Sequence, residues 1–135
     1  MSNTYVLDAS AMIVLLENRP GENRIARLIK EGDRLNASLL ASVVNWGEVF
    51  YFSWQRGGEE TARKAFNYLS LLPIRVLPVD APQAPKAAEL RALHHIPYVD
   101  CLAAALSSIH QATLVTADSD FEKLGRRFPI LWIER

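Results

Sequence analysis

The sequence predicts an α/β domain in which a mainly parallel central sheet is flanked by helices on both faces. Short apolar, β-branched runs recur along the chain, and one or two helical patterns separate each run from the next. This alternation is typical of parallel sheets, because a helix usually connects neighbouring parallel strands. There are no repeats or linkers, and 135 residues, half of them apolar, suffice for one continuous core. We therefore expect a single domain over residues 1–135.

The elements of the first half are identified from hydrophobic periodicity and from the residues that end each pattern. Ser10 is placed to cap the first helix, Gly32 to close the second, and Gly57-Gly58 to stop the third. The third helix carries apolar residues around much of its circumference, so we expect it to be substantially buried. The expected elements are a strand at 5–7, helices at 11–17 and 22–31, a strand at 34–37, and helices at 42–55 and 59–71.

The second half continues the same alternation. Pro73 and Pro78 lie at the two ends of the next strand, and Pro97 lies near the start of a strongly apolar helix. The expected elements are a strand at 74–79, helices at 85–95 and 98–110, a strand at 113–116, a short helix at 119–124 and a strand at 130–133.

Composition excludes several classes of protein. Fifteen basic residues balance fifteen acidic ones, so net charge does not indicate nucleic-acid binding. The single cysteine, Cys101, cannot form an internal disulfide, and we expect it to be a small buried hydrophobe. The N-terminus lacks the pattern of a secretory signal, and the longest apolar run, 11–16, is too short to cross a bilayer. We expect a soluble, cytoplasmic protein with no membrane partner.

Acidic residues occupy positions where a parallel sheet binds its ligands, beyond the carboxyl ends of the strands. Asp8 follows the first strand and Asp118 follows the strand at 113–116, with Asp120 two residues later. Glu48 and Asp100 lie in almost wholly apolar helices, and neither helix offers a lysine or arginine within a turn. Buried carboxylates need a partner, and oxygen-rich sites suit Mg²⁺ or Mn²⁺. The pattern therefore predicts a divalent metal site.

Each of these carboxylates also has a purely structural explanation. Asp8 and Asp118 could be strand-end or N-cap residues, and Asp100 could complement a helix dipole. Glu48 is the hardest to explain in this way. One shared site accounts for all four more simply than four separate coincidences.

At these residues the chain resembles the PIN-domain ribonucleases, in particular the VapC-type toxins of toxin–antitoxin pairs. The matching segments occur in the family's order and span nearly the whole chain. They are residues 6–11 (VLDASA), 45–49 (NWGEV), 97–105 (PYVDCLAAA) and 114–121 (LVTADSDF).

The resemblance implies a Rossmann-like three-layer sandwich and a Mg²⁺- or Mn²⁺-dependent endoribonuclease that forms a homodimer and is inhibited by a small antitoxin protein. It implies that an acidic quartet provides the catalytic and metal-binding groups: Asp8, Glu48, Asp100 and Asp118. Asp120 matches a more variable acidic position. Ser10 and Thr116 match small hydroxyl residues that orient ligands or water.

Two groups of basic residues could contact RNA phosphates without reading bases. Lys123, Arg126 and Arg127 follow Asp118 and are the better candidates. A solvated helix surface is the preferred interpretation of Arg24, Arg27 and Lys30.

Two other functions stay open at this point. Asp8 could accept a phosphoryl group in a phosphotransfer protein or phosphatase, although Ser10 stands where a haloacid-dehalogenase-like phosphatase needs a second aspartate. The chain could also be a binding module that keeps the fold without its chemistry.

Overall fold

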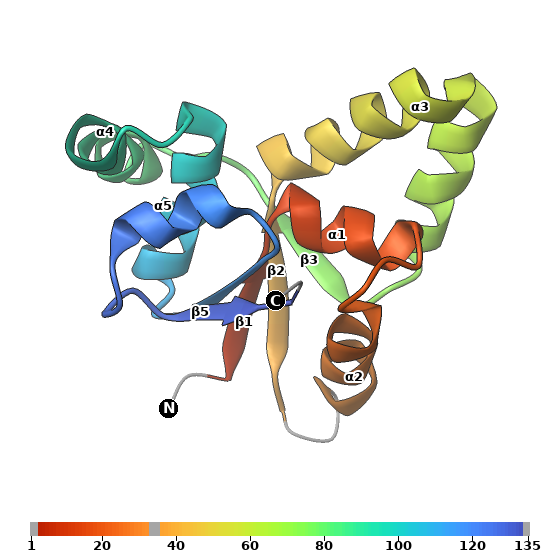
Figure 1. Ribbon diagram of the computed structural model, residues 1–135, viewed down its shortest axis with the longest axis horizontal. Coiled ribbons are helices and arrows are strands. Elements are labelled where there is room, and N and C mark those ends of the chain that lie inside the picture. Colours follow the sequence, from red (N-terminus) through yellow and green to blue (C-terminus); the bar gives the residue numbers. More distant parts are fainter. Residues whose placement is uncertain (1–2, 33–35, 134–135) are drawn as a thin grey trace.

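The computed structural model describes residues 3–32 and 36–133, in which five strands form one parallel sheet (Figure 1). The strand order is β3-β2-β1-β4-β5, and every neighbouring pair is parallel. The strands are β1 (Thr4–Leu7), β2 (Ser38–Ser42), β3 (Ile74–Leu77), β4 (Thr113–Thr116) and β5 (Ile130–Trp132). The predicted α/β class with a parallel sheet is confirmed.

Helices cover both faces of this sheet. They are α1 (Ala9–Leu16), α2 (Glu22–Gly32), α3 (Val43–Ser70), α4 (Gln83–His94), α5 (Tyr98–Ile109) and a short 3-10 helix, η1 (Ser119–Leu124). The α4 and α5 helices lie on one side and α1, α2 and α3 on the other, as Figure 1 shows. Among the described residues, no helix combines the length and apolar character that crossing a membrane requires.

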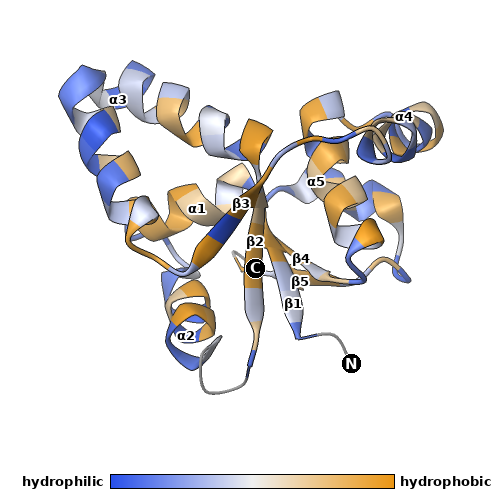
Figure 2. Ribbon diagram, turned by 180° about the vertical axis from the view of Figure 1, so that it is seen from behind, coloured by the Kyte–Doolittle hydropathy of each residue, from blue (hydrophilic) through white to orange (hydrophobic). Residues whose placement is uncertain are grey.

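The alternation of strand side chains divides the core into two layers. Val6 and Leu114 point toward α4 and α5, whereas Leu7 and Val115 point toward α1 and α3. Both layers are fully buried at these positions. Figure 2 shows the polarity that results, since α1 and α5 are largely hydrophobic and the far part of α3 is hydrophilic.

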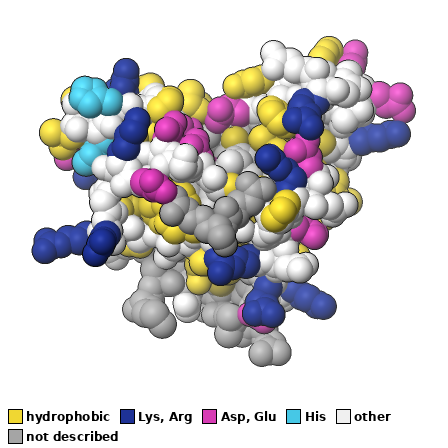
Figure 3. All heavy atoms as spheres, viewed as in Figure 1, with side chains coloured by type: hydrophobic (Ala, Val, Ile, Leu, Met, Phe, Trp, Pro, Cys, Tyr) yellow, Lys and Arg dark blue, Asp and Glu magenta, His cyan; other side chains and the backbone are white. Residues whose placement is uncertain are grey.

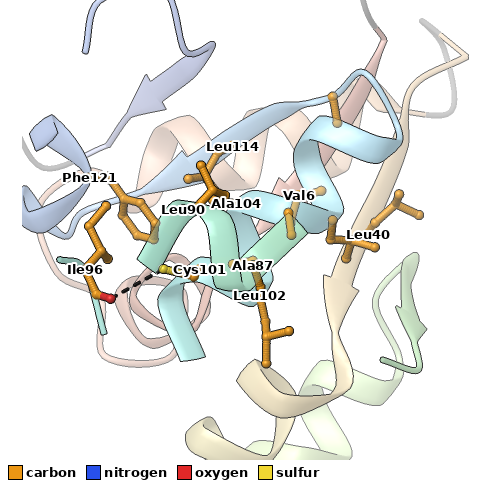
Figure 4. Packing of buried hydrophobic residues seen from close by; sticks show 14 residues of the cluster. Val6, Leu40, Ala87, Leu90, Ile96, Cys101, Leu102, Ala104, Leu114 and Phe121 are labelled. Atoms are coloured by element: carbon orange, nitrogen blue, oxygen red, sulfur yellow. Dashed lines mark hydrogen bonds between the residues drawn. The ribbon is translucent and has the colours of Figure 1, made fainter. Parts of the chain in front are cut away.

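The layer beneath α5 also anchors the segment that follows β4. Phe121 of η1 is completely buried and packs with Leu90 and Leu114 (Figure 4). The Cys101 thiol lies in the same layer and donates a hydrogen bond to the carbonyl of Ile96 at 3.4 Å. Cys101 is therefore a small buried residue, as expected.

The topology changes direction at β1. The chain adds β2 and then β3 on one side of β1, and then adds β4 and β5 on the other side. The connections leaving β1 and β4 therefore diverge at the carboxyl ends of two adjacent strands. Such a divergence opens a crevice, which is where open α/β sheets bind ligands.

The strand expected at residues 34–37 is wrong in position. Residues 34 and 35 lie outside the described residues, Asn36 has a left-handed φ of 55°, and Ala37 belongs to no strand. The strand is Ser38–Ser42, whose four residues from Leu39 onward are buried. Because both faces of this central strand are covered, its residues do not alternate in polarity, and their run merges with the start of the next helix.

Two expectations about helices also need correction. Ser10 does not cap α1, because the helix begins at Ala9 and the Asp8 carboxylate accepts a hydrogen bond from the Ala11 amide. The segment 42–55 is not substantially buried, since Val43 and Trp54 are 43% exposed and Tyr51 is 53% exposed.

The exposure of α3 follows from its path. The helix breaks at Gly58, whose φ of 88° and ψ of 177° are not helical, and this supports the expected stop at Gly57-Gly58. Beyond the break the chain turns back, as the bend in Figure 1 shows. Phe66 then packs against Trp46 and Phe50, with ring centroids 5.1 and 4.6 Å away. These aromatic side chains are thus covered partly by α3 itself rather than by the sheet.

Candidate functional site

Asp8 lies at the carboxyl end of β1 with both carboxylate oxygens hydrogen-bonded. Its Oδ1 accepts from the Ser10 hydroxyl at 2.7 Å and from the Ala11 amide at 2.9 Å. Its Oδ2 accepts from the Thr116 hydroxyl at 2.5 Å. The side chain is only 2% exposed. These donors hold the carboxylate in one orientation.

The Ser10 and Thr116 hydroxyls connect the ends of β1 and β4. The Ser10 Oγ accepts from the Ala117 amide at 2.9 Å, and the Thr116 Oγ1 accepts from the Asp118 amide at 2.9 Å. The two hydroxyl oxygens lie 3.1 Å apart. These hydrogen bonds fix the backbone that carries Asp118 relative to Asp8. The expected role of the two hydroxyls in orienting ligands or water stays a prediction.

A cluster of three carboxylates faces this junction. Asp118 caps η1, and its Oδ1 accepts from the Asp120 amide at 2.9 Å. Asp100, in the first turn of α5, joins them, and each of the three offers a carboxylate oxygen within 4.8 Å of the other two. All three side chains are half-buried. Asp120, expected only as an accessory residue, is therefore part of the cluster.

Glu48 approaches from the first turns of α3. Its half-buried carboxylate accepts a hydrogen bond from the Asn45 side-chain amide, with 2.7 Å between Nδ2 and Oε1. Asn45 lies three residues earlier, on the same side of the helix, and is completely buried. Asn45 was not among the predicted site residues, although a polar residue one turn before Glu48 in an apolar helix was a signal that the sequence offered.

The pKa values of Asp8, Glu48 and Asp100 show that the carboxylates of the quartet lie close together. Burial raises the pKa of Asp100 to about 7, and the charges of Asp118, Asp8, Glu48 and Asp120 add to this effect. Burial likewise raises the pKa of Asp8 to about 6 and raises that of Glu48, and in both cases Asp118 adds to the shift. The carboxylates therefore lie close enough to oppose one another's ionisation.

Basic side chains do not neutralise this cluster. Within residues 3–32 and 36–133, no lysine, arginine or histidine forms an ion pair with any of the five acids. The ion pairs there are surface contacts elsewhere: Arg19–Glu17, Arg56–Glu17, Arg63–Glu59, Lys64–Glu60 and Lys86–Glu89. Figure 3 shows acidic side chains gathered in the upper middle of the molecule, and basic side chains both at the edges of this face and in its right and lower parts. The donor set, carboxylate oxygens with no counter-charge, fits a hard divalent cation.

The structural explanation holds for two of the four predicted acids. Asp8 and Asp118 each cap a helix, so their positions do not by themselves require a metal. Glu48 and Asp100 cap no helix, and they lie near enough to each other for the charge of Glu48 to raise the pKa of Asp100. These two residues distinguish a shared site from a set of local caps.

The basic residues predicted to contact nucleic acid are exposed. Lys123 lies in η1, and Arg126 and Arg127 follow it directly. None of the three forms an ion pair with a described acid. In the first basic group, Arg24 on α2 donates to the carbonyl of Trp132, so this arginine has a structural contact.

A five-stranded parallel sheet in this order, with carboxylates gathered at the divergence of its strands, defines the class of protein. The model of the PIN domain family matches residues 5–127. The chain belongs to the PIN domain family.

Solved structures with the same fold cover almost the entire chain. VapBC2 from Rickettsia felis, bound to a DNA fragment from its promoter, matches with a TM-score of 0.75 and 18% identity over 95% of this chain and 97% of that one. VapBC-1 from nontypeable Haemophilus influenzae matches with a TM-score of 0.74 and 18% identity over 98% and 99%. VapC20 from Mycobacterium tuberculosis, described as a Sarcin-Ricin loop cleaving toxin, matches with a TM-score of 0.67 and 18% identity over 92% and 95%. The search of curated proteins gives no match.

Proposed function

We propose that this protein is a Mg²⁺- or Mn²⁺-dependent endoribonuclease and acts as the toxin of a toxin–antitoxin pair. One observation carries the nuclease proposal: Asp100 offers a carboxylate oxygen within 4.8 Å of one from Asp118 and lies near enough to Asp8 and Glu48 for their charges to raise its pKa, and no described basic side chain pairs with any of them. A divalent cation relieves this repulsion, and nothing else in the described chain does. On this proposal, residues 1–135 act as one nuclease domain.

The metal ligands in this proposal are Asp8, Asp100 and Asp118, with Glu48 as a further ligand or as the group that orients the attacking water. A divalent ion held there lowers the pKa of water and stabilises charge on phosphoryl oxygens. The fixed orientation of Asp8 supports the proposal, because its donors occupy some lone pairs and leave a rigid carboxylate toward the crevice. Asp120 has an accessory role.

The substrate in this proposal is an RNA strand whose phosphates contact Lys123, Arg126 and Arg127. The three cations are exposed and lie in η1 or shortly after it, near Asp118 and Asp120 in the sequence, so they can bind a backbone that passes the carboxylates. Hydrolysis is expected to leave 5′-phosphate and 3′-hydroxyl ends. VapC20, described as cleaving the Sarcin-Ricin loop, supports RNA as the substrate class through its shared fold.

A cognate antitoxin protein and a homodimer complete the proposal, with the cytoplasm as the site of action. The structural relatives include VapBC complexes that share almost the whole fold. The apolar side chains left exposed on α3, Val43, Tyr51 and Trp54, support a protein partner, since exposed apolar patches mark interaction surfaces.

The phosphotransfer alternative is less well supported. A haloacid-dehalogenase-like phosphatase needs a second aspartate two residues after the first, whereas Ser10 stands there and its hydroxyl donates to Asp8 Oδ1 at 2.7 Å. A binding module without chemistry would also gain no stability from mutually repelling carboxylates.

Cleavage of mixed RNA with Mn²⁺ or Mg²⁺ tests the nuclease proposal. Wild type is expected to cut, Asp8→Asn and Asp100→Asn to lose activity, and the control Asp80→Asn, which changes an exposed aspartate outside the site, to cut like wild type. Equal cutting by all four proteins would identify a contaminating nuclease and remove the proposal.

The toxin proposal predicts growth arrest on induction of the wild-type chain and normal growth on induction of Asp100→Asn at equal abundance. Sequencing the ends of cellular RNAs after brief induction then identifies the target. Normal growth with abundant, folded wild-type protein contradicts the toxin assignment.

A further inference from the structure

Asn45 is completely buried, yet only one end of its side-chain amide forms a hydrogen bond. Its Nδ2 donates to Glu48 Oε1 at 2.7 Å, whereas its Oδ1 is buried and has no hydrogen-bond partner. An ionised carboxylate can only accept hydrogen bonds, so the amide nitrogen, and not the oxygen, must face Glu48. The orientation that serves Glu48 is the one that leaves the amide oxygen unsatisfied.

The unsatisfied oxygen alone does not indicate a function. Gln83, at the start of α4, is also buried and has an unpartnered Oε1, while its Nε2 donates to the carbonyl of Pro78 at 3.0 Å. That contact fixes a loop. Asn45 differs in the group that it holds, because Glu48 belongs to the carboxylates that share the crevice.

Burying an amide with one unmet group costs stability, and an apolar residue of similar size would fill the same space between α3 and its neighbours without that cost. Glu48 has no other hydrogen-bond donor among the described side chains, so its carboxylate would otherwise be free to rotate toward solvent. The benefit of Asn45 therefore lies in the orientation of Glu48.

We propose that Asn45 is a positioning residue that holds the Glu48 carboxylate toward the acidic cluster and thereby strengthens binding of a divalent cation there. This inference rests on the proposed metal-dependent function. Asn45 acts through Glu48 and touches neither the cation nor the RNA.

The test measures Mn²⁺ binding by electron paramagnetic resonance for wild type, Asn45→Ala, Asn45→Leu and the matched control Gln83→Ala. Both Asn45 variants are expected to weaken Mn²⁺ binding about tenfold, as loss of a group that orients a metal ligand does. Gln83→Ala is expected to bind like wild type. Asn45→Leu keeps the branch at Cγ and leaves no cavity, so it complements Asn45→Ala if the cavity left by alanine is not tolerated; circular dichroism checks that each variant folds.

A double-mutant cycle with Glu48→Gln tests the route of the effect. If Asn45 acts through Glu48, adding Asn45→Ala to Glu48→Gln changes the Mn²⁺ dissociation constant by less than about twofold. A tenfold loss in that background as well would overturn the inference.

The outcomes separate the inference from the function on which it rests. If wild type binds Mn²⁺ and cuts RNA, and the Asn45 variants bind Mn²⁺ equally well, the role of Asn45 is overturned and the nuclease proposal stands. Wild type that neither binds Mn²⁺ nor cuts RNA overturns both.

Discussion

Asp100 differs from Asp8 in how its negative charge is accommodated. Three hydrogen bonds stabilise the ionised form of Asp8 and partly offset its burial. The pKa of Asp100 is raised by burial and by four neighbouring carboxylates, with no contact to offset them. Removing the charge of Asp100 should therefore relieve the repulsion within the cluster most clearly, and asparagine there breaks no side-chain hydrogen bond among the described residues.

The pH dependence of stability follows from these shifts. Between the ordinary aspartate pKa of 3.8 and folded values of about 6 for Asp8 and about 7 for Asp100, the folded state binds more protons than the unfolded state. Stability of the metal-free protein therefore falls as pH rises through this range. In EDTA, we expect a lower melting temperature at pH 8 than at pH 6 and a smaller difference for Asp100→Asn.

A control variant and added Mn²⁺ extend this melting-temperature experiment. Asp80→Asn should keep the wild-type pH dependence, and Mn²⁺ should raise the pH 8 melting temperature of wild type more than that of Asp100→Asn. A wild-type melting temperature in EDTA that does not fall from pH 6 to pH 8, or that falls no more than that of Asp100→Asn, would contradict the repulsion described here.

Thr116→Val tests the hydroxyl link between β1 and β4. Valine keeps the shape but removes the donor to Asp8 Oδ2 and the acceptor for the Asp118 amide, both in the interior. We expect a loss of about 1–3 kcal/mol in the free energy of unfolding by urea and a Mn²⁺ affinity lower by about tenfold. Thr113→Val, on the same strand, should change stability by less than about 0.5 kcal/mol. Equal effects of the two substitutions would exclude a special role for Thr116.

At the scale of elements, hydrophobic periodicity and the glycines and prolines that end helices and strands predicted most element boundaries. The strand at 113–116 and the short helix at 119–124 agree with the structure. β2 was misplaced because a strand buried on both faces lacks alternation. The exposure of α3 could not be predicted, since its aromatic side chains pack on the part of the same helix that returns after Gly58.

Gly21 sits where the α1–α2 connection passes the end of β5. Its φ is 98°, and a Cβ there would lie 1.8 Å from the carbonyl oxygen of Ile133. Gly21→Ala should lower the free energy of unfolding by about 1–3 kcal/mol through backbone strain alone, and by more through the steric clash. Gly47→Ala, in α3 with open space at the Cβ position, should stabilise by about 0.5–1 kcal/mol. Unfolding by urea that ranks the two variants in the opposite order would refute this account of Gly21.

At the scale of the molecule, the site depends on strand order, which the sequence does not reveal. Asp8 and Asp118 are 110 residues apart, and they meet only because β4 pairs with β1. Their common location was predicted from the general rule that parallel strands present their carboxyl ends on one edge. The membership of Asp120 in the cluster depends on side-chain geometry, about which periodicity carries no information. The spacing of three residues between Asn45 and Glu48 in an apolar helix was a signal for their contact, but it does not give the direction of the hydrogen bond.

Neutral net charge at this scale is consistent with a local site. Fifteen acidic residues balance fifteen basic ones, yet the acids of the crevice have no basic partner among the described residues. Charge separation within the molecule, rather than net charge, creates the attraction for a cation.

The central claim is that a divalent cation occupies the space between these carboxylates. Anomalous scattering from a crystal of the protein grown with Mn²⁺ tests it most directly. The account predicts an anomalous peak bounded by the carboxylates of Asp8, Asp100 and Asp118, with Glu48 beside it, and no such peak in crystals of Asp100→Asn. A map with no peak at this position, or with a lysine or arginine side chain there instead of Mn²⁺, would contradict it.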